Sequence, residues 1–203
     1  MADEEQESSW LIEPLGKDHD RAAFSCDREP LTEYLKTLAT QDARRNVATP
    51  FAACAAGANT VIGYYTLSSL SLELTDIPPD IAKKLPRYPV MGATLLGRLA
   101  IDQSMAGQGL GEYLLMDALR RALIASHPVA SVAVLTDPLA DRAVGFYRHC
   151  EFRPLQVTGT RLFLPMVTIK KLFEGYPPAG PPRGIRYAGR FCQIAGIAPP
   201  RSC

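Results

Sequence analysis

Residues 98–115 read RLAIDQSMAGQGLGEYLL, and this stretch decides the fold. A run of strand-forming residues ends at Asp102, three glycines follow at positions 107, 109 and 111, and an apolar pattern with helical spacing starts at Leu110. A strand that leads through close-set glycines into a helix is a candidate anion site, because the free N–H groups and the dipole of the helix N-terminus face the loop. Two phosphate-binding patterns are excluded, since Glu112 stands where the P-loop requires lysine and the dinucleotide fingerprint requires glycine.

The composition is that of a globular protein. The chain has 203 residues, 47% of them hydrophobic, which is enough to bury one sizeable core. Its acidic start, MADEEQES, does not resemble a signal peptide, and no apolar stretch approaches the ~20 residues of a membrane span. The five cysteines are scattered without a CxxC pair, which is typical of a reducing compartment. We therefore expect a cytoplasmic protein without a membrane association.

Charge and composition divide the chain into three expected segments. Residues 1–9 are polar and predicted to be disordered, residues 10–173 form the folded domain, and residues 174–203 form a tail with eleven Pro or Gly. From Arg153 onward, eight basic residues stand against one acidic residue, Glu174. A basic surface attracts phosphate polymers, and a solubilising tail is the alternative explanation of the same excess.

Hydrophobic periodicity predicts the secondary structure of the domain. The expected strands cover residues 10–15, 51–56, 60–67, 94–102, 129–137, 153–157 and 160–169, the last two as a hairpin around Thr158–Gly159. The expected helices cover residues 30–45, 110–123 and 141–149, and residues 75–90 are rich in proline and read as an irregular excursion. This mixed order predicts an α/β sheet with helices on its faces.

The glycine loop resembles the pyrophosphate loop of the GNAT acetyltransferases, whose pattern is Q/R-x-x-G-x-G/A after a strand. Ala106 stands at the Q/R position, so the side-chain donor of that pattern is missing. Downstream, the strand that ends at Asp137 and the helix bearing Ala143, Phe146 and Tyr147 resemble the later strand and the A-x-x-F-Y helix of the family. FYRHCEF resembles the FY…GF ending, with Glu151 in place of glycine. The resemblance implies the GNAT fold: a mixed, mostly antiparallel sheet of six or seven strands, splayed at the acetyl-CoA site, with helices on both faces.

Further segments resemble the toxin-type GNAT enzymes of bacterial toxin–antitoxin pairs. These segments are GRLAID before the loop, FSCDREPLTEYL, VIGYYTL and RLFLPMVTIKKLF. The resemblance implies transfer of an acetyl group from acetyl-CoA to the α-amino group of an aminoacyl-tRNA, which blocks translation. It also implies a homodimeric toxin and a ribbon-helix-helix antitoxin as partner. Two alternatives stay open: a non-toxin GNAT that acetylates a small amine or a protein N-terminus, and a catalytically inactive acyl-CoA-binding domain.

The resemblance also assigns site residues. Tyr147 is the expected general acid, which protonates the CoA sulfur. The acetyl-CoA site is expected to draw on the end of the strand, the glycine loop and the region of the later helix: Leu99, Ala100, Ile101, Gly107, Gln108, Gly109, Leu110, Gly111, Glu112, Asp137, Ala143 and Phe146. In the loop, most of the contacts would come from backbone N–H groups. No strong general base stands out, and an aminoacyl α-amine is less basic than a lysine, so it can react in its neutral form without one.

Basic residues supply the candidate contacts to RNA. Arg98 either faces the acceptor RNA or pairs with a carboxylate, and the remaining candidates lie in pairs or near proline: Arg44, Arg45, Lys83, Lys84 and Arg87. The three histidines, His19, His127 and His149, lack metal-ligand spacing, so we expect no metal.

Overall fold

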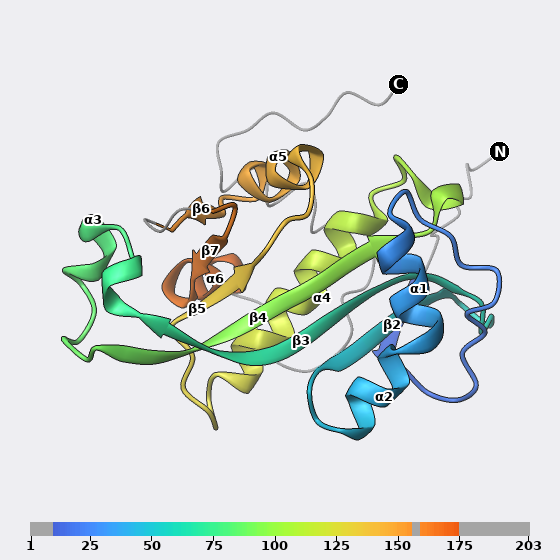
Figure 1. Ribbon diagram of the computed structural model, residues 1–203, viewed down its shortest axis with the longest axis horizontal. Coiled ribbons are helices and arrows are strands. Elements are labelled where there is room, and N and C mark those ends of the chain that lie inside the picture. The colour runs from blue at the N-terminus through green and yellow to red at the C-terminus, as the bar shows by residue number, and fades with distance from the viewer. Residues whose placement is uncertain (1–9, 156–158, 175–203) are drawn as a thin grey trace, which may run out of the picture. The chain divides into compact units, whose positions relative to one another are not determined.

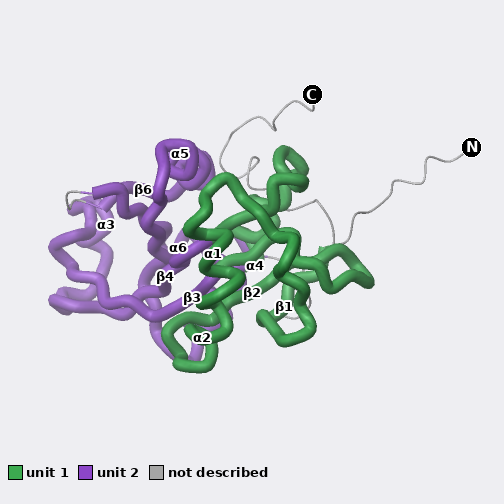
Figure 2. The backbone as a smooth tube through the Cα atoms, turned by 45° about the vertical axis from the view of Figure 1, so that its right-hand side comes forward, with its two compact units in different colours: residues 1–65, 99–117, 179–203 green, residues 66–98, 118–178 purple. Residues whose placement is uncertain are grey.

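The computed structural model describes residues 10–155 and 159–174. The expected N-terminal segment and the tail after Glu174 lie outside the described residues. The described chain falls into two compact units, one of residues 10–65 and 99–117 and the other of residues 66–98 and 118–174 (Figure 2). We call them unit 1 and unit 2 and describe each in turn.

The strands form one seven-stranded sheet in the order β1-β2-β3-β4-β5-β7-β6 (Figure 1). Pairing is antiparallel between β1 and β2, between β5 and β7 and between β6 and β7, and parallel between β4 and β5. The predicted α/β class with a mixed, mostly antiparallel sheet is confirmed. The strands are β1 (Trp10–Pro14), β2 (Thr49–Ala55), β3 (Val61–Glu73), β4 (Val90–Ile101), β5 (Ala133–Thr136), β6 (Arg153–Pro154) and β7 (Leu162–Pro165).

The helices follow the expected places with two corrections. They are α1 (Glu29–Thr37), α2 (Ala39–Arg44), α3 (Pro79–Ala82), α4 (Leu110–Ala125), α5 (Asp141–His149) and α6 (Met166–Leu172), with short 3-10 turns η1 (Leu74–Asp76) and η2 (Gln103–Met105). Helix α5 has the predicted bounds, and α4 begins at the predicted residue. None of the helices in the described ranges is long and apolar enough to cross a membrane.

The single helix predicted over residues 30–45 is wrong, because this segment forms two helices, α1 and α2. It breaks at Leu38, which separates α1 from α2 and is exposed rather than part of the apolar face. The Thr37 hydroxyl donates to the carbonyl oxygen of Glu33 at 2.8 Å, a back-bond of the kind that bends helices. The Tyr34 hydroxyl then donates to the Asp42 carboxylate at 2.9 Å, which ties the two short helices together across the break.

The strand predicted over residues 160–169 is wrong in its second half. Strand β7 ends at Pro165, and α6 begins at the next residue. The buried residues of α6 are Met166, Ile169 and Leu172, whose spacing is helical. The β-branched residues Val167 and Thr168, which suggested a strand, lie between them. The other strands near this end are shorter than predicted, and the excursion at 75–90 contains the single turn of α3.

Unit 1 packs the first part of α4 onto the sheet. Its core includes Phe24, Leu35, Tyr64 and Ala100. Gly63 on β3 permits the close approach of the helix, since a Cβ built there would lie 2.9 Å from Leu114 Cδ1 and 3.3 Å from the Ala100 carbonyl oxygen. Leu110 and Leu114 of α4 are buried at this contact. The packing thereby fixes where α4 begins.

Unit 2 has its own core around β5 and β7. Leu135 and Phe163 are buried in it, together with Leu72 and Ile77 from the segment that precedes α3. Figure 1 shows β5, β7 and α6 side by side, with α5 and β6 next to them. Strand β5 pairs with β4 on one side and with β7 on the other, so all four of its residues are buried.

We predict that Gly63→Ala lowers the stability of the protein. Overpacking a tight contact costs about 1–3 kcal/mol, and the added methyl group meets a backbone oxygen that cannot turn away. The measurement is the free energy of unfolding by denaturant titration. The control is Gly145→Ala on α5, where a Cβ meets no atom within 4 Å and where helix propensity favours alanine by about 1 kcal/mol. Equal stability of the two variants would contradict the close approach at Gly63.

Candidate active site

In unit 1, Asp102 holds the turn between β4 and the glycine loop. Its carboxylate accepts hydrogen bonds from the backbone N–H groups of Ser25, at 2.8 Å, and Ser104, at 3.0 Å, and from the Ser104 hydroxyl at 2.6 Å. Partial burial by itself would raise the pKa of Asp102, but these hydrogen bonds outweigh it and the pKa is lowered. The ionised carboxylate therefore ties the C-terminal end of β4 to the segment that precedes α1.

The glycines of the loop serve its backbone conformation. Gly107 and Gly109 have φ of +77° and +81°, a region that L side chains avoid, and a Cβ at either residue would meet no atom within 4 Å. The first backbone bond of α4 runs from the Tyr113 N–H to the Gly109 carbonyl oxygen at 3.1 Å. The N–H groups of Leu110, Gly111 and Glu112 thus belong to the first turn and have no acceptor within the helix. This geometry suits an anion.

Ala106, which lacks the side-chain donor of the family pattern, is exposed, and Gln108 is exposed as well. The Gln108 side-chain amide donates to the Ser104 carbonyl oxygen at 2.9 Å, so it braces the loop from within. Three residues predicted to bind acetyl-CoA lie on β4, where Ala100 is buried and Leu99 and Ile101 are half-buried. The pairing of β4 with β5 covers Thr94 to Leu96, whereas β4 runs on to Ile101.

In unit 2, Tyr147 lies near the C-terminal end of α5 with 5% of its surface exposed. Its ring packs edge-on against Phe146 and Phe152, with centroids 5.2 Å and 5.3 Å away. Its hydroxyl group is hydrogen-bonded to the side chain of Thr136, the last residue of β5. Burial raises the pKa of Tyr147 to about 12, although the hydrogen bond to Thr136 opposes the shift. The phenol therefore carries its proton at neutral pH and can act as a donor.

A Schellman motif ends α5 and holds Tyr147 in place. The Phe152 N–H donates to the Tyr147 carbonyl oxygen at 3.0 Å, and the Glu151 N–H donates to that of Arg148, also at 3.0 Å. The aromatic contact of Phe152 with Tyr147 is the hydrophobic contact that accompanies this motif. Glu151 occupies its left-handed position with φ of +62°, which explains why glycine is usual there.

Three more residues predicted to bind acetyl-CoA lie in unit 2, and one of them, Asp137, is bound to another side chain. The Asp137 carboxylate, directly after β5, accepts two hydrogen bonds from the Arg161 guanidinium at 2.7 Å and 2.6 Å. This hydrogen-bonded pair raises the pKa of Arg161. The Asp137 side chain is therefore already held by Arg161, and the backbone of Asp137 is the simpler candidate for the predicted contact with the pantetheine arm. Ala143 and Phe146 are half-buried on α5.

The basic candidates are divided between the units. Arg44 and Arg45 are exposed at the end of α2 in unit 1, whereas Lys83, Lys84 and Arg87 are exposed beyond α3 in unit 2. Arg98 is half-buried on β4.

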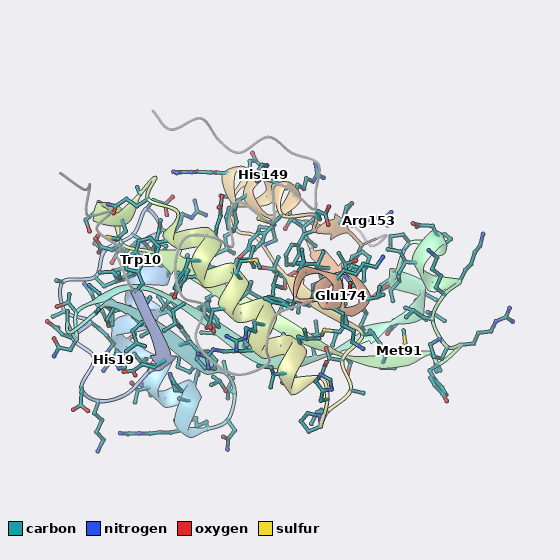
Figure 3. All side chains as sticks on the ribbon, turned by 180° about the vertical axis from the view of Figure 1, so that it is seen from behind. Trp10, His19, Met91, His149, Arg153 and Glu174 are labelled. Carbon is teal, nitrogen blue, oxygen red and sulfur yellow. The ribbon has the colours of Figure 1, made fainter. Side chains whose placement is uncertain are left out.

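The histidines take no part in a metal site. His149 lies exposed on α5, two residues from the buried Tyr147 (Figure 3). His19 accepts a hydrogen bond from the Gly16 N–H and lies 3.3 Å from Glu13. Among the described residues, no cluster of His, Cys, Asp or Glu could hold a metal ion. Cys26, Cys54 and Cys150 are buried and form no disulfide within the described part of the chain.

Sequence reasoning missed two residues that touch Tyr147. These are Thr136 and Phe152, one at the end of β5 and the other after α5. Phe152 stood within the quoted FYRHCEF ending and could have been found from it. Thr136 carried no local signal, because its contact depends on how β5 and α5 pack.

We predict that Glu151→Gly stabilises the protein. A non-glycine residue in the left-handed region costs about 1–2 kcal/mol, and glycine gives back about 0.5–1 kcal/mol through its freedom in the unfolded chain. The expected net gain is about 0.5–1 kcal/mol in the free energy of unfolding, measured in urea. Glu151→Ala is the control and brings no comparable gain, because alanine keeps the strain. A loss of stability in Glu151→Gly would show that the carboxylate itself stabilises the fold.

Comparison with known proteins gives consistent matches. No family model matches the chain. The chain is 30% identical over 170 residues to a probable toxin TacT of Sinorhizobium fredii, covering 80% of this chain and 94% of the relative. It is 34% identical over 134 residues to a tRNA-acetylating toxin of Mycobacterium tuberculosis, covering 66% of this chain and 78% of that toxin.

Solved structures agree with these relatives. AtaT in complex with acetyl-methionyl-tRNAfMet matches with a TM-score of 0.76 and 32% identity, over 81% of this chain and 99% of that one. A tyrosine-to-phenylalanine mutant of KacT matches with a TM-score of 0.77 and 30% identity, over 83% of this chain and 100% of that one. AtaT has also been solved with acetyl-CoA and with the C-terminus of the antitoxin AtaR. The chain therefore belongs to the family of GNAT-type toxin acetyltransferases that includes TacT, AtaT and KacT.

Proposed function

We propose that the protein is an acetyl-CoA-dependent N-acetyltransferase that acetylates the α-amino group of an aminoacyl-tRNA and thereby inhibits translation. The observation that carries this proposal is the match over nearly the whole length of AtaT, which has been solved with acetyl-methionyl-tRNAfMet. The family also supports a protein antitoxin as partner, since AtaT has been solved with AtaR. The ribbon-helix-helix class of that antitoxin, the homodimer and the cytoplasmic location stay predictions.

Acetyl-CoA would be bound mainly through backbone groups. The N–H groups of residues 107–112 suit its pyrophosphate, because the positive φ at Gly107 and Gly109 and the start of α4 bring them together. The part of β4 that runs beyond its pairing with β5, up to Ile101, would offer backbone groups to the acetyl and pantetheine portions, as a strand edge does. In unit 2, the candidate contacts to acetyl-CoA are the backbone of Asp137 and the half-buried Ala143 and Phe146.

Tyr147 would supply the proton that the leaving group needs. The neutral α-amine attacks the thioester carbonyl carbon, a C–N bond forms, and the C–S bond breaks with its electron pair on sulfur. The sulfur takes the phenol proton of Tyr147, and the proton released by the amine restores the phenol through solvent. An α-amine titrates near ~8, so a useful fraction is neutral at physiological pH without a general base.

Contacts to the RNA would come from the basic residues of both units. Arg98, half-buried on β4, is the candidate nearest in sequence to the loop, and the exposed candidates are Arg44, Arg45, Lys83, Lys84 and Arg87. Each phosphate contact removed should weaken tRNA binding and reduce its salt dependence.

We predict that Tyr147→Phe lowers kcat by about 10²-fold or more, which is the usual contribution of general acid catalysis. The assay follows CoA release with methionyl-tRNAfMet as the first acceptor and a pool of aminoacylated tRNA as the second. Expression of the wild type should arrest growth and translation, and expression of Tyr147→Phe should not.

Acetyl-CoA binding by calorimetry is the control for this variant, and it should remain intact because the phenol contributes to chemistry rather than to affinity. An unchanged kcat would remove Tyr147 from its proposed role. Absence of growth arrest by a wild type that binds acetyl-CoA would overturn the toxin function and leave a small amine, a protein N-terminus or mere acyl-CoA binding as the alternatives.

We further predict that Gly109→Ala raises the KM for acetyl-CoA by about tenfold, because a left-handed alanine costs about 1–2 kcal/mol and turns the loop amides away. Gly57→Ala is the matched control, since Gly57 has a φ of +77°, close to the +81° of Gly109, and open surroundings in the turn between β2 and β3. It should lose similar stability without a change in the KM for acetyl-CoA.

Ala106→Gln should alter the KM for acetyl-CoA by less than about threefold if backbone amides dominate the binding of the pyrophosphate. Much tighter binding by Ala106→Gln would show that the side chain matters.

A further inference from the structure

Thr136 is a buried polar residue at the place where β5 stops. Only 3% of its surface is exposed, and it ends a strand whose residues are all buried. Its backbone is held from both sides, since it pairs with Leu96 of β4 and with Leu162 of β7. A threonine fixed in this way keeps its hydroxyl at a constant place, and the branched Cβ restricts the side chain further.

The hydroxyl of Thr136 is directed to the phenol of Tyr147, to which it is hydrogen-bonded. The phenol is held independently by the Schellman motif and by the rings of Phe146 and Phe152. Both hydroxyl groups are thus placed by rigid elements of the same unit. Within the described residues, no buried side-chain N or O atom is left without a partner, so the pair is satisfied as it stands.

The direction of this hydrogen bond matters for the proposed chemistry. A phenol that gives its own proton to Thr136 has none to offer to the sulfur. A phenol oxygen that accepts the Thr136 proton keeps its own proton available, and the bond strengthens as negative charge develops on that oxygen.

We infer that Thr136 is a positioning residue for Tyr147: its hydroxyl donates to the phenol oxygen, directs the phenol proton toward the leaving sulfur and stabilises the tyrosinate that forms. This inference rests on the proposed role of Tyr147 and adds a residue that acts through it. The proton that leaves Tyr147 goes to sulfur, and Thr136 keeps its own proton throughout, so the balance of the reaction is unchanged.

The test is a double-mutant cycle in purified full-length protein, with methionyl-tRNAfMet as acceptor and CoA release as readout. Thr136→Val removes the hydroxyl and keeps the shape, and it should lower kcat by about tenfold while the KM for acetyl-CoA stays within twofold. In the Tyr147→Phe background, Thr136→Val should change kcat by less than twofold, because the group through which it acts is gone. Thr136→Ser restores the hydroxyl and should recover most of the kcat.

Two further variants complete the test, one as a matched control and one as a substitute for Thr136→Val. Thr94→Val is the matched control: Thr94 lies two residues before Leu96 on β4, and its hydroxyl bonds to Ser131 at 3.0 Å, so this variant should leave kcat unchanged. Thr136→Ala replaces Thr136→Val if the latter does not fold, and the same tenfold loss is expected.

The inference is overturned if Thr136→Val and Thr136→Ala keep the wild-type kcat while Tyr147→Phe loses it. It is also overturned if Thr136→Val loses the same factor in the Tyr147→Phe background, or if Thr136→Ser stays as slow as Thr136→Val. A fully active Tyr147→Phe is a different outcome, which removes the proposed role of Tyr147 and the inference with it.

Discussion

The parallel pairing of β4 with β5 ends at Leu96 and Thr136, and the parts of the candidate site depend on that end point. Strand β5 stops there with a buried hydroxyl group, whereas β4 continues for five residues to Ile101. The longer strand leads through Asp102 into the glycine loop, and the shorter one leads through Asp137 into α5. The difference in strand length leaves residues 97–101 of β4 beyond the pairing with β5 and places Thr136, at the end of β5, against Tyr147.

The two units contribute different chemistry. Unit 1 offers backbone N–H groups at the start of α4, placed by the positive φ of Gly107 and Gly109 and by the close approach that Gly63 allows. Because these are backbone groups, the lack of a side-chain donor at Ala106 does not remove them. Unit 2 offers a side chain, the phenol of Tyr147, whose use demands accurate placement.

Burial and hydrogen bonding shift the pKa of Tyr147 in opposite directions. Burial raises its pKa to about 12, which keeps the proton on the phenol, and the bond to Thr136 limits the rise. The ring contacts and the Schellman motif hold the phenol in position through packing and backbone hydrogen bonds. Glu151 completes that motif in a strained, left-handed backbone conformation.

Local patterns in the sequence determined the element types, the start of α4, the bounds of α5 and the family, because apolar spacing and glycine placement are local properties. The same patterns did not predict the break at Leu38 or the helix after Pro165, where a Thr37 back-bond and the burial of Met166, Ile169 and Leu172 prevailed over propensity. Tertiary structure alone decided that Asp137 pairs with Arg161 and that Thr136 meets Tyr147. Those contacts join residues 24 and 11 positions apart, and only the packing of strands and helix fixes such distances.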